Sequence, residues 1–367
     1  MKGLYIHIPF CCKKCNYCDF ASFPNLFSRA DEYIDALLKE MEIYKDENIN
    51  TIYFGGGTPS VLTACQLHKI MDGVFSSFNV STDSEITIEV NPCTVDYRKA
   101  KDILDIGFNR VSLGAQSFVD TELNSLGRLG SSDDTLKAYN DLSSAGFNNI
   151  SLDLMYAIPG QTIDTLSTSL GCMLKLKPKH ISCYGLKIED GTPFADMKRE
   201  GIITEKSDDE YADMYEFICS TLSNAGYIQY ELSNFSLPGY HSRHNLKYWT
   251  LCDYIGIGLS SSSCYRGERY TRTHNFEKYI KSFENAESYK LTKDEAMSEY
   301  MFLSFRLTQR GANKQEFKDL FNLDIEDVFF DEINKHIKNG LILDRGDSYI
   351  LTPKAYYISN AVLCDFV

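Results

Sequence analysis

Apolar and polar residues follow two recurring patterns through the first half of the chain. Short runs rich in β-branched and aromatic residues predict strands, and the segments between them have apolar residues three or four positions apart. In residues 30–45, for example, Ile34, Leu37, Leu38 and Met41 share one face of a predicted helix. The six predicted strands lie at residues 3–8, 51–54, 85–90, 110–114, 151–156 and 180–186.

Strands that alternate with helices are typical of parallel βαβ units with right-handed crossovers. Six such units are too few to close an eight-stranded barrel. The pattern therefore predicts an α/β fold built as a partial (β/α)6 barrel of the TIM type. The helical pattern at 133–146 should end at Gly146, and another helix-rich segment at 204–225 leads into a polar, aromatic stretch from 227 to 275.

The pattern changes beyond about residue 285. Helices are expected at 293–307 and 314–321, followed by a hairpin at 340–352 and a last helix with Thr352 as N-cap and Pro353 at its first position. This order predicts a small α+β, winged-helix-like domain that packs or closes over the core. The chain is thus divided into a core at 1–235, a connecting segment at 236–285 and a C-terminal domain at 286–367.

Composition and charge narrow the class of protein. The 367 residues carry a formal net charge of −14, which argues against a broad nucleic-acid surface, so no nucleic-acid partner is expected. No run approaches the ~20 apolar residues of a membrane helix. The N-terminus lacks the apolar stretch of a signal peptide, so a cytoplasmic location is expected. The sequence leaves both a monomer and a homodimer open.

Four of the twelve cysteines lie close together near the N-terminus. A disulfide is unfavourable in the reducing cytoplasm. Cys11, Cys15 and Cys18, spaced C-x3-C-x2-C, can hold an iron–sulfur cluster with one iron left open, because such clusters ordinarily take four cysteines. Zinc would need a fourth ligand, which Cys12 or His7 could supply, although Cys12 adjoins Cys11 and fits tetrahedral geometry poorly. The spacing favours the cluster and leaves zinc open.

Glycines and polar residues stand at the ends of the following predicted strands. The segment YFGGGTPS at 53–60 would let the backbone approach a ligand, although a tight βα turn uses the same residues. Glu89, Gln116 and Asp153 lie at or near the ends of the next three strands. Because strand C-termini meet at one mouth of such a barrel, these groups and the cysteines are expected around a single cavity.

These motifs, together with YIHIPFC, EVNP, SLGAQSF, LGR and DLMYAIPGQT, resemble the radical S-adenosylmethionine (SAM) family. More narrowly, they resemble its branch of oxygen-independent coproporphyrinogen oxidase and a related heme chaperone, through 180–194 and 231–249 as well. The resemblance implies that Cys11, Cys15 and Cys18 hold a 4Fe-4S cluster whose fourth iron binds SAM. An electron from the cluster would cleave SAM to methionine and a 5′-deoxyadenosyl radical. The positions that match SAM-binding residues are Tyr5, Tyr17, Gly56, Gly57, Thr58, Glu89, Gln116, Arg128 and Asp153.

Two features favour the chaperone branch. The oxidase has the pattern C-x3-C-x2-C-x-C, and in this chain Phe20 stands at the position of the last cysteine. The oxidase also has a longer segment before the cluster motif. HNLKYW at 244–249 matches a signature linked to heme binding in the chaperone branch. The resemblance implies that His244 binds heme iron and that Tyr248 and Trp249 pack against the macrocycle.

The leading hypothesis is therefore a heme chaperone with a 4Fe-4S cluster, SAM and heme, which passes heme to heme-requiring proteins, among them respiratory enzymes at the membrane. The alternative is an oxidase that decarboxylates coproporphyrinogen III to protoporphyrinogen IX. The chain departs from the family at Gly130 and Ser262, where histidines are expected. Some of the basic residues near HNLKYW are hypothesised to bind heme propionates; the alternative is that they are ordinary solvated surface charges. These residues are Arg243, Lys247, Arg266, Arg269 and Arg272.

Overall fold

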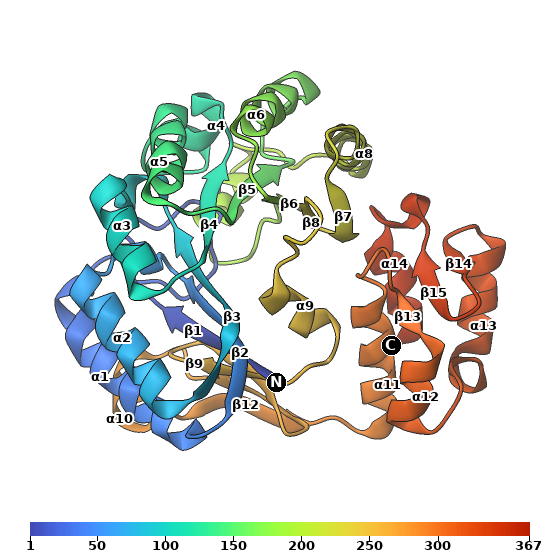
Figure 1. Ribbon diagram of the computed structural model, residues 1–367. Helices are drawn as coiled ribbons and strands as arrows, with labels where there is room; N and C mark the ends of the chain where they lie inside the picture. Colours follow the sequence, from blue (N-terminus) through green and yellow to red (C-terminus); the bar gives the residue numbers. More distant parts are fainter.

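The computed structural model describes residues 1–367 and is built around one curved sheet of twelve strands. Strands β1 to β6 follow one another in the sheet and are all parallel (Figure 1). The prediction of six parallel strands in a partial barrel is confirmed. These strands are β1 (Lys2–Ile8), β2 (Asn48–Gly56), β3 (Asn79–Val90), β4 (Arg110–Gln116), β5 (Ile150–Tyr156) and β6 (His180–Gly185).

Further strands extend the sheet at both ends. At one end β9 pairs with β1 in parallel and is followed by three antiparallel strands, and at the other end β8 and β7 follow β6. Residues 254–285, expected in the connecting segment, and residues 286–290, expected in the C-terminal domain, therefore continue the sheet of the core. These strands are β7 (Ile228–Glu231), β8 (Asn234–Ser236), β9 (Tyr254–Ile257), β10 (Ser262–Tyr265), β11 (Glu268–Arg272) and β12 (Asn285–Lys290).

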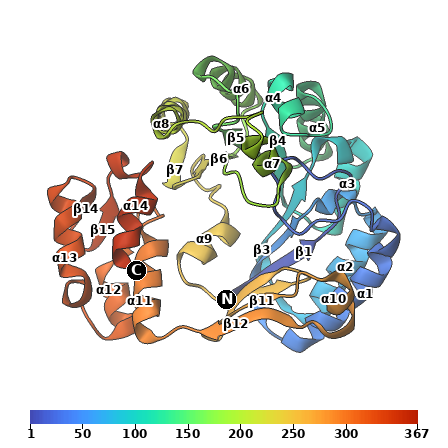
Figure 2. The ribbon, with the colours of Figure 1, turned by 180° about the vertical axis from the view of Figure 1, so that it is seen from behind.

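Helices cover the outer, convex face of the sheet, as both views of the ribbon show (Figures 1 and 2). The helix expected at 133–146 is α5, which a capping box starts at Ser131 and which Gly146 ends in the left-handed conformation at φ +116°. The helices of this part are α1 (Ala30–Met41), α2 (Ala64–Ser77), α3 (Tyr97–Ile106), α4 (Asp120–Ser125), α5 (Ser132–Ala145), α6 (Ile163–Leu176), α7 (Pro193–Arg199), α8 (Asp208–Asn224), α9 (Arg243–Trp249) and α10 (Phe276–Ser282).

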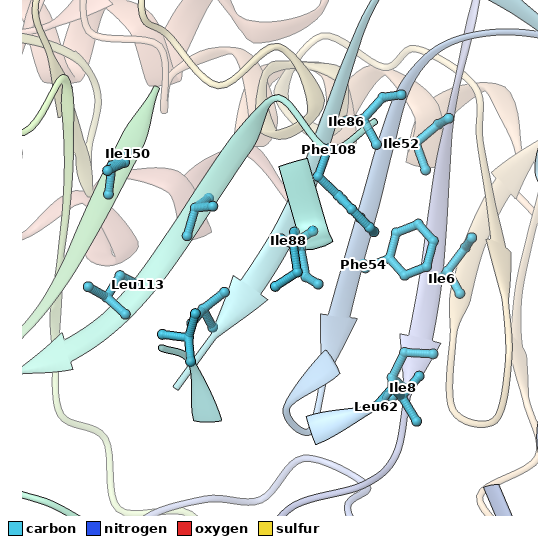
Figure 3. Packing of buried hydrophobic residues seen from close by; sticks show 14 of the residues in the cluster. Ile6, Ile8, Ile52, Phe54, Leu62, Ile86, Ile88, Phe108, Leu113 and Ile150 are labelled. Carbon is cyan, nitrogen blue, oxygen red and sulfur yellow. The ribbon is translucent and has the colours of Figure 1, made fainter. Parts of the chain in front are cut away.

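The main core lies between the sheet and these helices. Alternate residues of each strand, such as Ile6, Phe54 and Ile88, point outward and form one apolar layer in Figure 3. Phe108 closes edge-on against Phe54, with ring centroids 4.9 Å apart. Because strand residues alternate, the positions between these apolar side chains point into the barrel, where Glu89 and other polar groups lie.

The C-terminal domain has a core of its own and a three-stranded antiparallel sheet. The predicted hairpin is confirmed, but Thr352 starts only a 3-10 turn, because its hydroxyl donates to the Gly340 carbonyl at 2.8 Å instead of capping a helix. No helix of the chain is long and apolar enough to cross a membrane. The elements are α11 (Lys293–Ser304), β13 (Ala312–Asn313), α12 (Lys314–Phe321), α13 (Ile325–Lys338), β14 (Ile342–Asp344), β15 (Ser348–Leu351) and α14 (Ser359–Leu363).

Candidate functional site

A cavity of about 540 Å³ opens inside the barrel, at the C-terminal ends of the parallel strands. It brings together eleven of the twelve residues expected to hold the cluster and SAM. Tyr5 lines a neighbouring cavity instead, beside Tyr248. The eleven are Cys11, Cys15, Tyr17, Cys18, Gly56, Gly57, Thr58, Glu89, Gln116, Arg128 and Asp153.

The three cysteines come from the loop that follows β1. The Cys11 sulfur lies 3.4 Å from the Thr58 hydroxyl, so the cysteine loop and the glycine turn meet. Burial raises the pKa of the Cys18 thiol to about 11, and a bound iron ion would lower it by stabilising the thiolate. Three thiolates around an open cavity fit a cluster that leaves one iron free for a further ligand.

The fourth ligand that zinc would require is absent. No three His, Cys, Asp or Glu side chains converge closely enough to hold a single ion. Cys12 is exposed and lines a separate small cavity beside Cys93. Both ring nitrogens of His7 are engaged, Nδ1 with the Tyr5 hydroxyl at 3.2 Å and Nε2 with the Ala21 carbonyl at 2.9 Å. The donor set therefore suits a cluster better than a structural zinc ion.

The glycine turn after β2 is both a tight turn and a close approach. Gly56 has φ +109°, and a β-carbon there would meet the His7 ring at 2.6 Å. A β-carbon at Gly57 would lie 2.7 Å from the Phe10 carbonyl oxygen. The Gly57 and Thr58 amides each donate at 2.8 Å to carbonyls of residues 8 and 10, which fastens this turn to the start of the cysteine loop. The segment YFGGGTPS therefore fits both predictions, a tight βα turn and a backbone free of obstructing side chains.

Two partly buried carboxyl groups line the cavity. Burial raises the pKa of Glu89 to about 7, although the Tyr53 hydroxyl donates to it at 2.9 Å. Burial also raises the pKa of Asp153, whose two oxygens each accept from the Ser112 hydroxyl at 3.0 Å. Carboxyl groups held in this way can accept hydrogen bonds from an ammonium or from ribose hydroxyls.

Arg128 places a partly buried positive charge next to the cysteines. Its Nη1 lies 3.9 Å from the Cys15 sulfur, and its Nη2 donates to the Gly114 carbonyl. Gln116 adopts φ +66°, and its side-chain oxygen accepts from the Tyr184 hydroxyl at 2.6 Å. A left-handed conformation is uncommon for glutamine, so the chain holds this side chain in place at some cost.

Arg110 is a cavity residue that sequence reasoning missed. It begins β4, lies at the opposite end of the cavity from the cysteines, and is only 1% exposed. Its guanidinium makes no hydrogen bond or ion pair with the protein, and its Nε is fully buried without a partner. An arginine at the start of a predicted strand is ordinarily expected to be exposed to solvent, so the sequence gives no indication that Arg110 is buried.

HNLKYW forms the helix α9, which closes the barrel at the N-terminal ends of the strands, opposite the cysteines. His244 lies in the first turn of this helix, which the Ser242 hydroxyl caps and whose Arg243 and His244 amides donate to Glu85. His244 is fully buried: Nδ1 bonds the Thr51 hydroxyl at 2.9 Å and Nε2 bonds the Tyr248 hydroxyl at 2.8 Å.

Trp249 points toward the C-terminal domain, where the Arg306 guanidinium lies 4.3 Å from its ring centroid. The basic residues near α9 are not a free patch. The hypothesis that they meet propionates is unsupported, because each is engaged within the protein. Arg243 contacts Asp83, Lys247 the Met1 carbonyl, Arg266 Glu47, Arg269 Glu299 and Arg272 Glu40.

The two departures from the family pattern have different surroundings. Gly130 has φ +90°, and a β-carbon there would collide with the Cys93 sulfur, so a histidine cannot replace it without rearrangement. Ser262 is exposed, and its hydroxyl lies 3.0 Å from that of Thr271. It lines the neighbouring cavity that also contains Tyr5.

Comparison with known proteins shows the family of this chain. The radical SAM superfamily matches residues 5–171, and the HemN C-terminal domain matches residues 291–358. Coproporphyrinogen III oxidase (HemN) from Escherichia coli has the same fold, with a TM-score of 0.85 at 21% identity, covering 99% of this chain and 89% of that chain. At this identity the likeness concerns the fold alone.

Relatives over the full length are heme chaperones. HemW of Lactococcus lactis is 35% identical, with 99% of this chain and 96% of the relative covered. HemW of Bacillus subtilis is 34% identical, over 100% and 99% of the two chains, and HemW of Escherichia coli is 32% identical, over 98% and 97%. With such identity over nearly the whole of both chains, the protein belongs to the HemW family of the radical SAM superfamily.

Proposed function

We propose that the protein binds a 4Fe-4S cluster, SAM and heme, and that it delivers heme to heme-dependent proteins, including respiratory enzymes at the membrane. The observation that carries the cofactor part is the single cavity that joins three cysteines to the glycine turn and to buried polar groups. The heme part is supported by the full-length relatives, which are named heme chaperones.

Within the cavity, each group has a chemical task that suits it. Cys11, Cys15 and Cys18 would bind three irons, and the fourth would be open to the amino and carboxylate groups of SAM. The Arg128 guanidinium suits a carboxylate, and the Glu89 and Asp153 carboxyls suit an ammonium or ribose hydroxyls. SAM bound next to a reduced cluster supplies a 5′-deoxyadenosyl radical.

Heme binding through α9 would require a change of conformation. His244 must release Thr51 and Tyr248 before either of its nitrogens can reach an iron. We therefore do not assign the iron ligand to His244 in the conformation described here. Tyr248, by contrast, already lines the cavity next to the cysteine loop, and Phe20 lines the same cavity.

The test is a titration of anaerobically reconstituted protein with hemin, followed by its Soret absorbance. The proposal predicts saturable binding with a Soret band distinct from that of free hemin. Iron and acid-labile sulfide are counted in the same sample, and zinc in place of iron would contradict the cluster assignment.

A second candidate is oxygen-independent coproporphyrinogen oxidase. The presence of Glu89, Arg128 and Asp153 in the cluster cavity favours the oxidase, because its radical chemistry would need SAM to be bound there. Phe20 argues against the oxidase candidate, since the oxidase pattern has a cysteine at that position. The candidates separate in an anaerobic assay with SAM, a reductant and coproporphyrinogen III: the oxidase releases two molecules of CO2 for each substrate, and the chaperone releases none.

A further inference from the structure

A second cavity, of about 660 Å³, adjoins the cluster cavity. Its walls are the end of the cysteine loop, the inner face of β1 and β9, and the side of α9 that bears Tyr248. Both cavities share the loop residues Lys14, Asp19, Phe20 and Ser22. A molecule in the second cavity would therefore lie next to the cluster loop without occupying the SAM site.

The lining of this cavity suits a flat apolar molecule. Tyr5, Phe20, Phe23, Tyr248 and Tyr254 all contribute to it. The Phe20 side chain is 63% exposed and makes no ring contact with another aromatic residue, although it stands at the rim of a cavity. The volume is within the range of about 300–1,000 Å³ typical of small-molecule sites.

The cavity also contains an imidazole with a free nitrogen. His274 Nδ1 lies 2.8 Å from the Ser260 hydroxyl, and His274 Nε2 makes no hydrogen bond. Ser260 adopts φ +60°, a conformation that is uncommon for a residue with a side chain. With the proton on Nδ1 and donated to Ser260, the Nε2 lone pair is available for a metal ion, and Ser260 fixes the direction of the ring.

None of the other six histidines combines a free nitrogen with this cavity. His7, His180 and His244 each have both nitrogens engaged inside the protein. The remaining three, His68, His241 and His336, line neither the cluster cavity nor the second cavity.

The position of His274 also fits a departure from the family pattern. Ser262 stands where the family has a histidine, and Ser262 lines this same cavity. His274, twelve residues later in the chain, brings an imidazole back to the cavity from the segment after β11. Ser262 and His274 thus line the same cavity.

We propose that the second cavity is a heme site in which His274 Nε2 binds the iron and Phe20 packs against the macrocycle. This inference rests on the proposed heme binding and adds to it a location and an iron ligand. The ligand class is an iron tetrapyrrole, because the site combines an aromatic lining with a single free imidazole.

The experiment compares hemin binding by the reconstituted wild-type protein, His274→Ala and a matched control, His68→Ala. Both histidines are exposed, so neither substitution disturbs the core. His274→Ala is expected to weaken hemin binding by about tenfold or more and to shift the Soret band, and added imidazole should restore the wild-type band. His68→Ala should behave as the wild type.

A second variant tests the cavity independently of the ligand. Ser262→Trp would fill the space from an exposed position and should weaken binding of both hemin and metal-free protoporphyrin IX, whereas His274→Ala should weaken only hemin. Wild-type affinity and an unchanged Soret band in His274→Ala would overturn the inference while leaving the proposed function intact. Absence of hemin binding by the wild-type protein would overturn both.

Discussion

Truncation of His244 separates a structural role from a heme-binding role. The imidazole is fully buried, bonds the hydroxyls of Thr51 and Tyr248, and stacks on the Tyr53 ring with centroids 5.2 Å apart. In His244→Ala the buried Thr51 hydroxyl loses its partner at about 1–3 kcal/mol, the partly buried Tyr248 hydroxyl loses its partner at a smaller cost, and the ring leaves a cavity. We therefore expect the free energy of unfolding of the barrel to fall by roughly 3–5 kcal/mol.

The assay is guanidinium unfolding at pH 7.5, followed by the fluorescence of the single tryptophan. Trp249 is suitable because it belongs to α9 and contacts Arg306 of the C-terminal domain, so its emission reports on whether α9 is seated. His244→Asn keeps one hydrogen-bonding group near the position of Nδ1 and should lie between the wild type and His244→Ala. His68→Ala, on the exposed face of α2, is the control for loss of an imidazole.

One result would refute this reasoning. If His244→Ala unfolds at the same denaturant concentration as the wild type but loses hemin binding, the imidazole binds iron and is not a structural part of the barrel. If instead both stability and hemin binding fall, the loss of binding reflects the displaced helix, and His244→Asn should recover both together.

Three further predictions concern the cavity and its surroundings. Gly57→Ala should reduce iron incorporation on reconstitution, because its β-carbon would lie 2.7 Å from a carbonyl of the cysteine loop; Gly171→Ala, with open space around it, should not. Arg110→Met should raise the free energy of unfolding of the cofactor-free protein by about 1–3 kcal/mol, since it removes a buried guanidinium that has no hydrogen-bond partner, and the Asp153 carboxyl that this guanidinium attracts can take up a proton instead; a lower thermal midpoint would contradict this. The free energy of unfolding should fall between pH 6.5 and pH 4. Burial lowers the pKa of His7 to about 4, that of His244 to about 3 and that of His180 strongly, so in this range only the unfolded chain takes up protons at these histidines. Denaturant midpoints at pH 7 and pH 5 measure the loss.

The size of the pH effect has two opposing parts. Each neutral buried histidine contributes up to about 1.4 kcal/mol per pH unit below pH 6.5. Glu89, Asp153 and Glu231 act in the opposite direction, because burial raises the pKa of each carboxyl, that of Glu89 to about 7, and the folded state takes up these protons first. Their stabilising contribution is present in acid and is lost as the pH rises through the folded-state pKa values, so these carboxyls offset part of the loss from the histidines. A rise in stability on acidification to pH 5 would contradict the burial of these imidazoles.

The parallel strands and the polar groups at their ends could be predicted because one physical rule governs both. Strands covered by helices on their outer face carry apolar residues at alternate positions, and βαβ topology brings their C-terminal ends to one mouth. Glu89, Gln116 and Asp153 lie in one cavity for this reason, although their separation along the chain is large.

The later strands and α9 could not be predicted in the same way. All six residues of β12 (Asn285–Lys290) are exposed, so no apolar alternation marks this strand, and only pairing with β11 defines it. The helix α9 has only seven residues and depends on Glu85, far away in sequence, which accepts from its first amides. Such tertiary partners leave no local pattern.

The central claim is that Cys11, Cys15 and Cys18 hold a 4Fe-4S cluster whose open iron binds SAM inside the barrel. The most direct measurement is the electron paramagnetic resonance spectrum of the reduced, reconstituted protein, recorded with and without SAM labelled with ¹⁵N in its amino group. The account predicts a spectrum that changes on addition of SAM and shows hyperfine coupling to the labelled nitrogen. An unchanged spectrum without this coupling, at saturating SAM, would contradict it.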